Sequence, residues 1–242
     1  MKHPVQVLLL VLTGIGLLHA ALFTDLYLRY VKEGLRPLLI ISGVLLLLLG
    51  LAAAVRDRTH TEHAGHTHGH DHSRAPGVAW LLFLPALSLL FYAPPALGAY
   101  TAARSDGKVV NEHTAFDPLP ATSPVPLTLT DFTVRVQQDR DRAIKGRTVQ
   151  MTGFASPTEH GGGWYLARII FTCCAADAQT VKVRMYGTKA PPPNTWLAVT
   201  GTWHPRGTLG TKTAEAALDV RSTRPIAPPV NAYTDDLPLV PS

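Results

Sequence analysis

Three long runs without a charged residue fill most of the first hundred positions, and they limit the possible folds more than any other feature. The runs are Val5–Phe23, Pro37–Val55 and Ala75–Ala103, and the spanning part of the third is expected at Gly77–Ala99. A helix of about 20 apolar residues crosses the hydrocarbon core of a bilayer. We therefore predict a membrane part at 1–100 with three spanning helices, at 5–23, 37–55 and 77–99. This prediction excludes a wholly soluble protein.

A secretory signal peptide is the main alternative for the first of these runs. The run has 19 residues, whereas the apolar region of a signal peptide usually has about 7–15. No clean A-x-A cleavage site follows it. We therefore expect a retained helix and a multi-pass membrane protein.

The orientation of these helices depends on the positive charges between them. With three spans, the N-terminus and the loop 56–76 lie on one side, and the loop 24–36 and everything after residue 100 lie on the other. Four Lys and Arg residues lie near the membrane on the first side and five on the second, which does not discriminate. The three arginines of the loop 56–76 favour the cytoplasm for that loop. The C-terminal half is then predicted to be extracytoplasmic.

The net charge of +5 is spread evenly along the chain. Residues 1–100 hold 7 Lys and Arg against 5 Asp and Glu, and the remaining residues hold 15 against 12. Binding to nucleic acid needs clustered positive charge, because the phosphates are contacted together. We therefore expect no nucleic acid as a partner, whereas the apolar runs make the lipid bilayer one.

The loop 56–76 is rich in histidine. Six of the eleven histidines of the chain lie in one 13-residue stretch of this loop: His60, His63, His66, His68, His70 and His72. Neutral imidazoles bind Zn, Cu, Ni and Co, and glycine between them lets a segment wrap round an ion. A histidine-rich loop between membrane helices also resembles the metal-sensing loops of zinc transporters. Metal capture, with zinc as the first choice, is the functional interpretation, and a solvated polar connection is the alternative.

A polar, proline-rich stretch at 101–126 follows the membrane part. Its prolines prevent a continuous helix and favour extended chain: Pro118, Pro120, Pro124 and Pro126. We predict a tether there, which leads to a soluble domain at 127–228 and a tail at 229–242.

The soluble domain has the pattern of a small β-barrel. A helix capped by Thr130 or Asp131 and extending to Ile144 is expected first. Five strand-like segments separated by turn residues follow: Thr148–Ala155, Trp164–Thr172, Thr180–Tyr186, Thr195–Trp203 and Ala217–Ile226. Five short strands in this length predict an all-β, OB-like five-stranded barrel. Gly153 and Gly201 stand where such strands bend or bulge.

The only two cysteines, Cys173 and Cys174, are adjacent in the chain and are followed by Asp177. Neighbours in a regular strand point to opposite faces, but a turn at the end of the second strand could direct both sulfurs the same way. The two thiols and the carboxylate would then offer three ligands, with His204 the preferred fourth and His160 the alternative. The competing interpretation is two small residues packed at a strand end.

The segment RIIFTCCAADAQTVKV, between TVQMTGFA and TWLAVTGTW, resembles the uncharacterised bacterial YcgQ-like membrane proteins. The resemblance covers nearly the whole chain and is carried by Cys173, Cys174, Ala175, Ala176 and Asp177. It implies a bacterial cell-membrane location, a companion membrane permease and a link to metal transport. It does not imply an established activity.

Two functional classes follow from these features. The first is a membrane-anchored accessory subunit of a permease that handles or senses a transition metal such as zinc. The second is a membrane-tethered OB-like module that binds a protein, a peptide or an oligosaccharide without metal. An enzyme is not expected, because the sequence has no nucleophile motif, no nucleotide-binding loop and no paired acid and base.

Overall fold

The computed structural model describes residues 3–60, 96–105, 107, 113, 115–158 and 163–237. These residues form two compact units. The first comes from positions 1–24 and 36–96, and the second from positions 25–35 and 97–242. The segment 25–35, which joins the first two helices and is called the connector below, therefore belongs to the same unit as the C-terminal domain.

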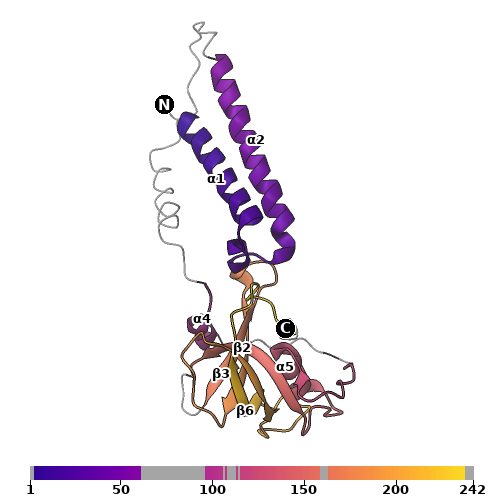
Figure 1. The fold of residues 1–242 in the computed structure, drawn as a ribbon. Helices are drawn as coiled ribbons and strands as arrows, with labels where there is room; N and C mark the ends of the chain where they lie inside the picture. Colours follow the sequence, from indigo (N-terminus) through magenta and orange to yellow (C-terminus); the bar gives the residue numbers. More distant parts are fainter. Residues whose placement is uncertain are drawn as a thin grey trace. The chain divides into compact units, whose positions relative to one another are not determined.

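The first unit contains the helices α1 (His3–Phe23) and α2 (Arg36–His60), which lie side by side in Figure 1. Both are long and apolar enough to cross a membrane, within Gln6–Phe23 and Glu33–Arg56. Only 11% of each window is buried, whereas the core helix of a soluble protein would be mostly buried. Two of the three predicted helices are thus present. The predicted span 77–99 lies outside the described residues, except for its last four positions.

Glycines let α1 and α2 approach closely. A Cβ atom built on Gly14 would lie 2.9 Å from the carbonyl oxygen of Gly43, and one on Gly50 would lie 2.9 Å from a methyl group of Val11. Small residues at such contacts are typical of helix pairs in membranes, where van der Waals packing replaces the hydrophobic effect. At the end of α1, the Arg36 Nε donates to the carbonyl oxygen of Ala21 at 2.8 Å, which satisfies an unpaired C-terminal carbonyl group.

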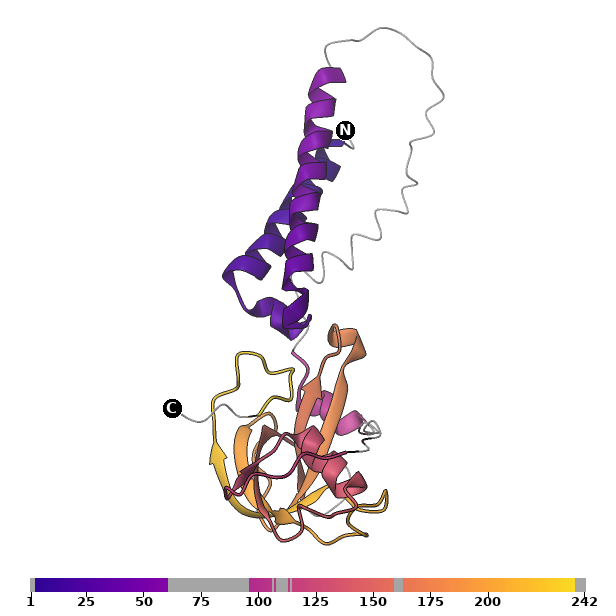
Figure 2. The same cartoon turned by 90° about the vertical axis from the view of Figure 1, so that its right-hand side faces the viewer.

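The second unit is built on a closed barrel of five strands (Figures 1 and 2). The strands are β2 (Thr148–Ser156), β3 (Trp164–Ile170), β4 (Gln179–Tyr186), β5 (Trp196–Trp203) and β6 (Ala217–Pro225). The order is β2-β3-β4-β6-β5, and β5 pairs with β2 to close the ring. The β4–β6 pair is parallel and the other pairs are antiparallel. This confirms the OB-like barrel, and every predicted strand end falls within two residues of the observed one.

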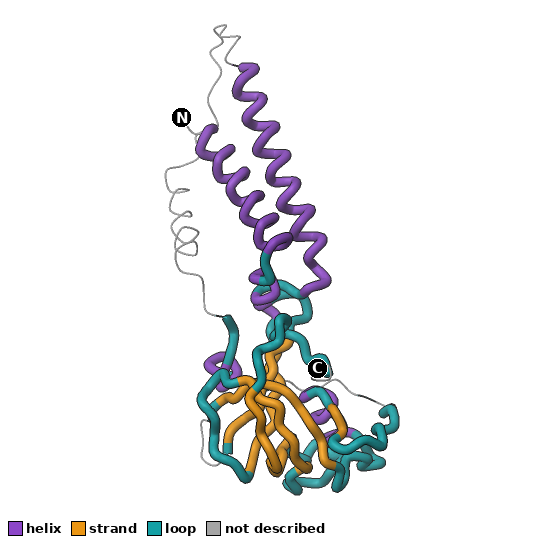
Figure 3. The backbone as a smooth tube through the Cα atoms, in the orientation of Figure 1, coloured by secondary structure: helices purple, strands orange, loops and turns teal. Residues whose placement is uncertain are grey.

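The barrel core comes from the alternating inward positions of the strands, and α5 (Leu129–Gln138) packs against it. The fully buried members include Trp164, Leu166, Met185 and Leu218. Phe132 and Val136 of α5 join the same cluster. Figure 3 shows the strands enclosing this interior, with helix and loops around them. Period-two burial in the strands and an amphipathic helix thus supply one continuous core.

Two strand glycines mark the places where the barrel curves. The β5–β6 register shifts between Thr200 and Gly201, and a Cβ on Gly201 would lie 2.3 Å from the carbonyl oxygen of Asp219. A Cβ on Gly153 of β2 would lie 2.7 Å from the carbonyl oxygen of Ala167. Near Gly153, β2 changes partner from β5 to β3. The predicted bends are therefore close backbone approaches that only glycine permits.

The helix before the barrel is shorter than predicted. Its N-cap is Thr128, whose hydroxyl accepts from the amide of Asp131 at 2.9 Å, so the predicted caps Thr130 and Asp131 are wrong. The helix ends at Gln138 rather than Ile144. Beyond it, the Asp139 carboxylate accepts from the amides of Asp141 and Ala143, each at 3.0 Å. This side chain thereby stabilises a turn in place of further helix.

Parts of the segments expected as tether and tail pack against the barrel. Within 101–126, β1 (Val125–Pro126) pairs in parallel with β2, and Val125 is fully buried. The short helix α4 (Ala99–Arg104) packs against β2 and β3. Within 229–242, Tyr233 is buried against Phe171. The Asp235 carboxylate accepts from the first amides of α5. Extended proline-rich chain can thus pair with a sheet where its neighbours supply donors.

Candidate thiol site

The two cysteines lie in a tight turn between β3 and β4. The short 3-10 helix η4 (Ala175–Asp177) follows them directly, and Cys174 is its N-cap. Before them, Phe171 donates its amide to the carbonyl oxygen of Tyr233 at 3.2 Å and stacks on the Tyr233 ring at 4.3 Å. Tyr233 in turn donates its hydroxyl to the carbonyl oxygen of Leu97 at 3.0 Å. The turn is therefore attached to the C-terminal segment, which is in turn hydrogen-bonded to Leu97, where the longer segment of the second unit begins.

Asp177 organises this turn with its carboxylate. The carboxylate accepts backbone hydrogen bonds from Thr172 at 2.9 Å, from Cys173 at 2.7 Å and from Cys174 at 3.4 Å. The Cys173 thiol also donates to it, and these donors together hold the pKa of Asp177 below its usual range. A carboxylate with so many donors is committed to shaping the turn, so the structure gives Asp177 a structural role.

The turn brings the two sulfurs together. Their Sγ atoms are 3.7 Å apart, and both cysteines are free thiols. Cys173 is exposed and Cys174 is half-buried. Cys174 is extended, with φ −155° and ψ 175°, yet the turn at Cys173 prevents the opposite orientation that a regular strand would impose. The site therefore presents two neighbouring thiols to solvent.

The Cys173 thiol is held in its protonated form. The hydrogen bond to Asp177 and then the hydrogen bond to Cys174 raise its pKa from the ordinary 9.0 to about 11. The negative charge of Asp177 acts in the same direction, because it disfavours a thiolate beside it. At neutral pH, a ligand that needs thiolate must therefore displace a proton from Cys173.

The connector pairs with the cysteine turn through its backbone. Val31 and Cys174 form an antiparallel β-bridge. The amide of Lys32 donates to the carbonyl oxygen of Cys173 at 2.9 Å, and the amide of Ala175 donates to the carbonyl oxygen of Tyr30 at 2.8 Å. Sequence reasoning missed this contact, because Tyr30–Lys32 have no motif and lie more than a hundred positions away.

His204 is far from the cysteines, so its prediction as fourth ligand is wrong. Its ring stacks on Tyr186, the last residue of β4, at 4.2 Å. The cysteine turn instead precedes the first residue of β4, Gln179. Eight residues of strand separate the two places by roughly 20 Å. The Nδ1 atom of His204 lies 2.8 Å from Asp219 Oδ1. His204 stands one residue beyond the end of β5, and this position in the sequence did not predict Asp219 as its partner.

The remaining predicted ligands are not placed by the structure. His60 ends α2, but its side chain is outside the described part, and so are His63, His66, His68, His70, His72 and His160. Among the side chains that are described, no group of three or more His, Cys, Asp or Glu residues is arranged to hold one metal ion. A four-ligand site at the cysteines is therefore not assembled from the described residues.

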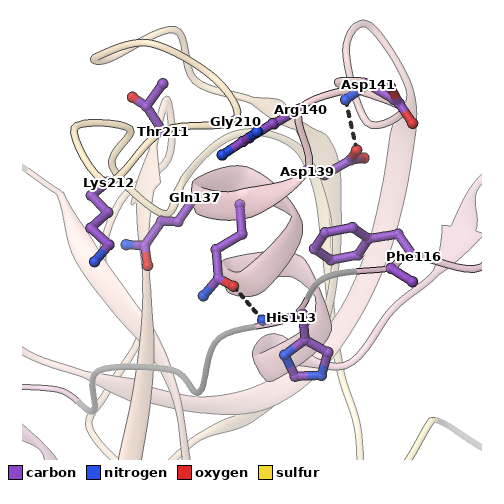
Figure 4. Close-up of a pocket in the computed structure, with 11 residues that line it drawn as sticks. His113, Phe116, Gln137, Asp139, Arg140, Asp141, Gly210, Thr211 and Lys212 are labelled. Atoms are coloured by element: carbon purple, nitrogen blue, oxygen red, sulfur yellow. Dashed lines mark hydrogen bonds between the residues drawn. The ribbon is translucent and has the colours of Figure 1, made fainter.

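A separate depression of about 850 Å³ lies beside the end of α5 (Figure 4). Phe116, Gln137, Arg140 and Lys212 line it, together with Asp139. The Asp139 carboxylate already accepts hydrogen bonds from backbone amides, and the amide of Gly210 donates to the carbonyl oxygen of Val136 at 2.8 Å. None of the predicted site residues is among the described residues that line this depression.

The sequence comparison concerns the unit that carries the thiols. Residues 131–234 match the DUF1980 C-terminal domain. This match supports an uncharacterised DUF1980-family protein. It spans all five barrel strands, the cysteine turn and Tyr233. No curated protein and no solved structure matches the chain.

The thiol chemistry of this domain can be tested through Asp177. In a Cys174→Ser background, Asp177→Asn removes the negative charge but keeps an oxygen that can accept from the turn amides. The pKa of Cys173 should then fall toward 9.0. A lower thiol pKa raises the thiolate fraction but weakens each thiolate as a nucleophile, so exchange with an aromatic disulfide near about pH 8 should accelerate by up to about tenfold. An unchanged rate would contradict the role assigned to the carboxylate.

Proposed function

We propose that this protein is a membrane-anchored accessory subunit of a permease, and that Cys173 and Cys174 bind a transition-metal ion such as zinc. The observation that carries the proposal is the pair of accessible sulfurs 3.7 Å apart on one turn. Adjacent cysteines packed for bulk alone would not need to present both thiols in this way. The proposal assigns no catalytic step to the protein.

The spacing of the sulfurs suits a tetrahedral ion. Two sulfurs bound to one tetrahedral zinc at about 2.3 Å lie about 3.8 Å from each other. The observed 3.7 Å would therefore require little movement of the turn. Structural zinc sites have four protein ligands, whereas open sites keep positions for other groups. Two thiols on an exposed turn thus suit a site that receives and releases metal, with further ligands from a companion permease.

The membrane arrangement belongs to the same proposal. The connector and the barrel form one compact unit, so they must lie on the same side of a bilayer that α1 and α2 cross. The chain must then return across the bilayer between α2 and Leu97, where the sequence predicts the third span. The proposal has three spans in a bacterial cell membrane and an extracytoplasmic barrel, and it is supported by this contact and by the basic loop 56–76.

Zinc titration of the metal-free full chain in detergent, under reducing conditions, tests the metal-binding function. Replacing the six histidines at 60–72 with serine should remove one class of zinc binding and leave folding unchanged, because loop residues contribute little packing. In that background, about one zinc per chain should remain at the thiols. Adding Cys173→Ser and Cys174→Ser should abolish it.

The matched control for the thiol site is His204→Ser in the same background. It removes a metal-binding side chain that the structure places at the other end of β4. Its zinc content should equal that of the parent. Zinc content that survives loss of both thiols would refute metal binding at the turn.

A further inference from the structure

The cysteine pair is held from two sides by backbone hydrogen bonds. On one side, the Asp177 carboxylate accepts from the amides of Cys173 and Cys174, and the amide of Asp177 donates to the carbonyl oxygen of Cys174 at 3.1 Å. On the other side, the carbonyl oxygen of Cys173 accepts from Lys32. All four backbone polar groups of the dipeptide are therefore occupied, and one of them is occupied by the connector.

The connector also borders the half-buried thiol. Val31 and Cys174 are directly opposed in the bridge, flanked by the bonds Lys32 to Cys173 and Ala175 to Tyr30. In such a pair the two side chains lie on the same face as close neighbours. Residues 30–32 thus limit both the backbone rotation of the cysteine pair and the space beside the Cys174 sulfur.

We propose that Tyr30–Lys32 position the two thiols for metal, and that metal at the thiols in turn stabilises the contact with the connector. This inference rests on the proposed function. The connector is the segment between the two apolar helices α1 and α2. Its contact with the turn therefore links occupancy of the barrel site to that segment. Tyr30–Lys32 are positioning residues, since they act through the turn and not as ligands.

The sign of the coupling follows from the geometry. The sulfur spacing that suits one tetrahedral ion occurs in the conformation in which the connector is paired. Losing the pairing releases the Cys173 carbonyl group and lets the turn sample other sulfur separations. Two sites that favour the same conformation strengthen each other by the same factor in both directions. The connector therefore favours metal binding, and metal slows opening of the connector.

Lys32→Pro tests the first direction, because proline removes the amide that donates to Cys173 while the carbonyl group remains. Lys32→Ala is the matched control, since it keeps the amide and removes only an exposed side chain. Glu33→Pro is a second control, because Glu33 is the first residue of a 3-10 helix, a position that tolerates proline. All variants are made in the full chain with the six loop histidines replaced by serine.

Lys32→Pro should weaken zinc binding about tenfold, the upper range for one backbone hydrogen bond, and both controls should bind within about twofold of the parent. In the parent, zinc should slow hydrogen exchange of the Ala175 amide about tenfold, and it should not do so when both cysteines are serine. The exchange measurement remains decisive if Lys32→Pro does not fold.

Three results would overturn the inference. Equal zinc affinity in Lys32→Pro and the parent would overturn the positioning role and leave metal binding at the thiols in place. If zinc leaves the hydrogen exchange of the Ala175 amide unchanged, the effect of metal on the connector is overturned, and metal binding at the thiols again stays in place. If the parent binds no zinc through its thiols, the proposed function fails and this inference fails with it.

Discussion

A membrane-impermeant maleimide should modify cysteines placed at positions 33 and 189 from one side of the membrane and a cysteine at position 65 from the other. Position 33 lies in the connector and position 189 lies in the barrel domain, and both belong to the second compact unit. Both are exposed. Position 65 lies in the loop that the three-span prediction puts across the bilayer. The effect should be all or none, because a folded barrel cannot pass through the hydrocarbon core.

The experiment uses the chain with Cys173 and Cys174 replaced by serine, so that each introduced thiol is the only one. Detergent-solubilised protein provides the control, in which all three positions should react. Opposite labelling of positions 33 and 189 would contradict the pairing of the connector with the cysteine turn. Labelling of position 65 from the same side as position 33 would exclude three spans.

Arg168→Met should destabilise the barrel by about 3 kcal/mol, because each buried acceptor left without its donor costs roughly 1–3 kcal/mol. Arg168 is 5% exposed. Its guanidinium donates to the carbonyl oxygen of Thr152 at 3.0 Å, to the Thr152 hydroxyl at 2.9 Å and to the carbonyl oxygen of Thr234 at 2.9 Å. It also lies 4.9 Å from the centre of the Trp196 ring. Methionine fills similar space but leaves these acceptors without their donor.

The loss should be measured by urea unfolding followed by far-ultraviolet circular dichroism. Arg224→Met is the matched control, because Arg224 is exposed on β6 and its loss should cost no more than about 0.5 kcal/mol. The same bonds hold the chain at Thr234, next to the Asp235 carboxylate that caps α5. An Arg168→Met protein as stable as the control would show that the hydrogen bonds of Arg168 do not stabilise the barrel.

The local features of the fold were predictable from the sequence. Helices α1 and α2 follow from the length of uncharged chain, and β2 to β6 follow from alternating apolar residues between glycine and proline turns. The helix cap was misplaced by two or three positions, because Thr128, Thr130 and Asp131 are all residues that can cap a helix. Each of these signals depends on residues within a few positions of one another.

The contacts that assemble the candidate site were not predictable in this way. His204 and the cysteines each stand at a strand end, and sequence cannot say which ends meet in a closed barrel. The same holds for the salt bridge of Arg184 with Glu215, which joins β4 to a loop. The register of the strands and the closure of the barrel determine which residues come into contact, and both depend on all five strands together.

The sequence by itself determined two apolar helices, five strands and a pair of adjacent thiols beside an aspartate. Only the tertiary structure decided that Asp177 binds backbone amides, that His204 pairs with Asp219, and that residues 30–32 border the cysteines. The physical reason is that apolar length, alternation and turn preference act over a few residues. A hydrogen bond between Lys32 and Cys173 instead requires the connector and the barrel to be folded before the two atoms can meet.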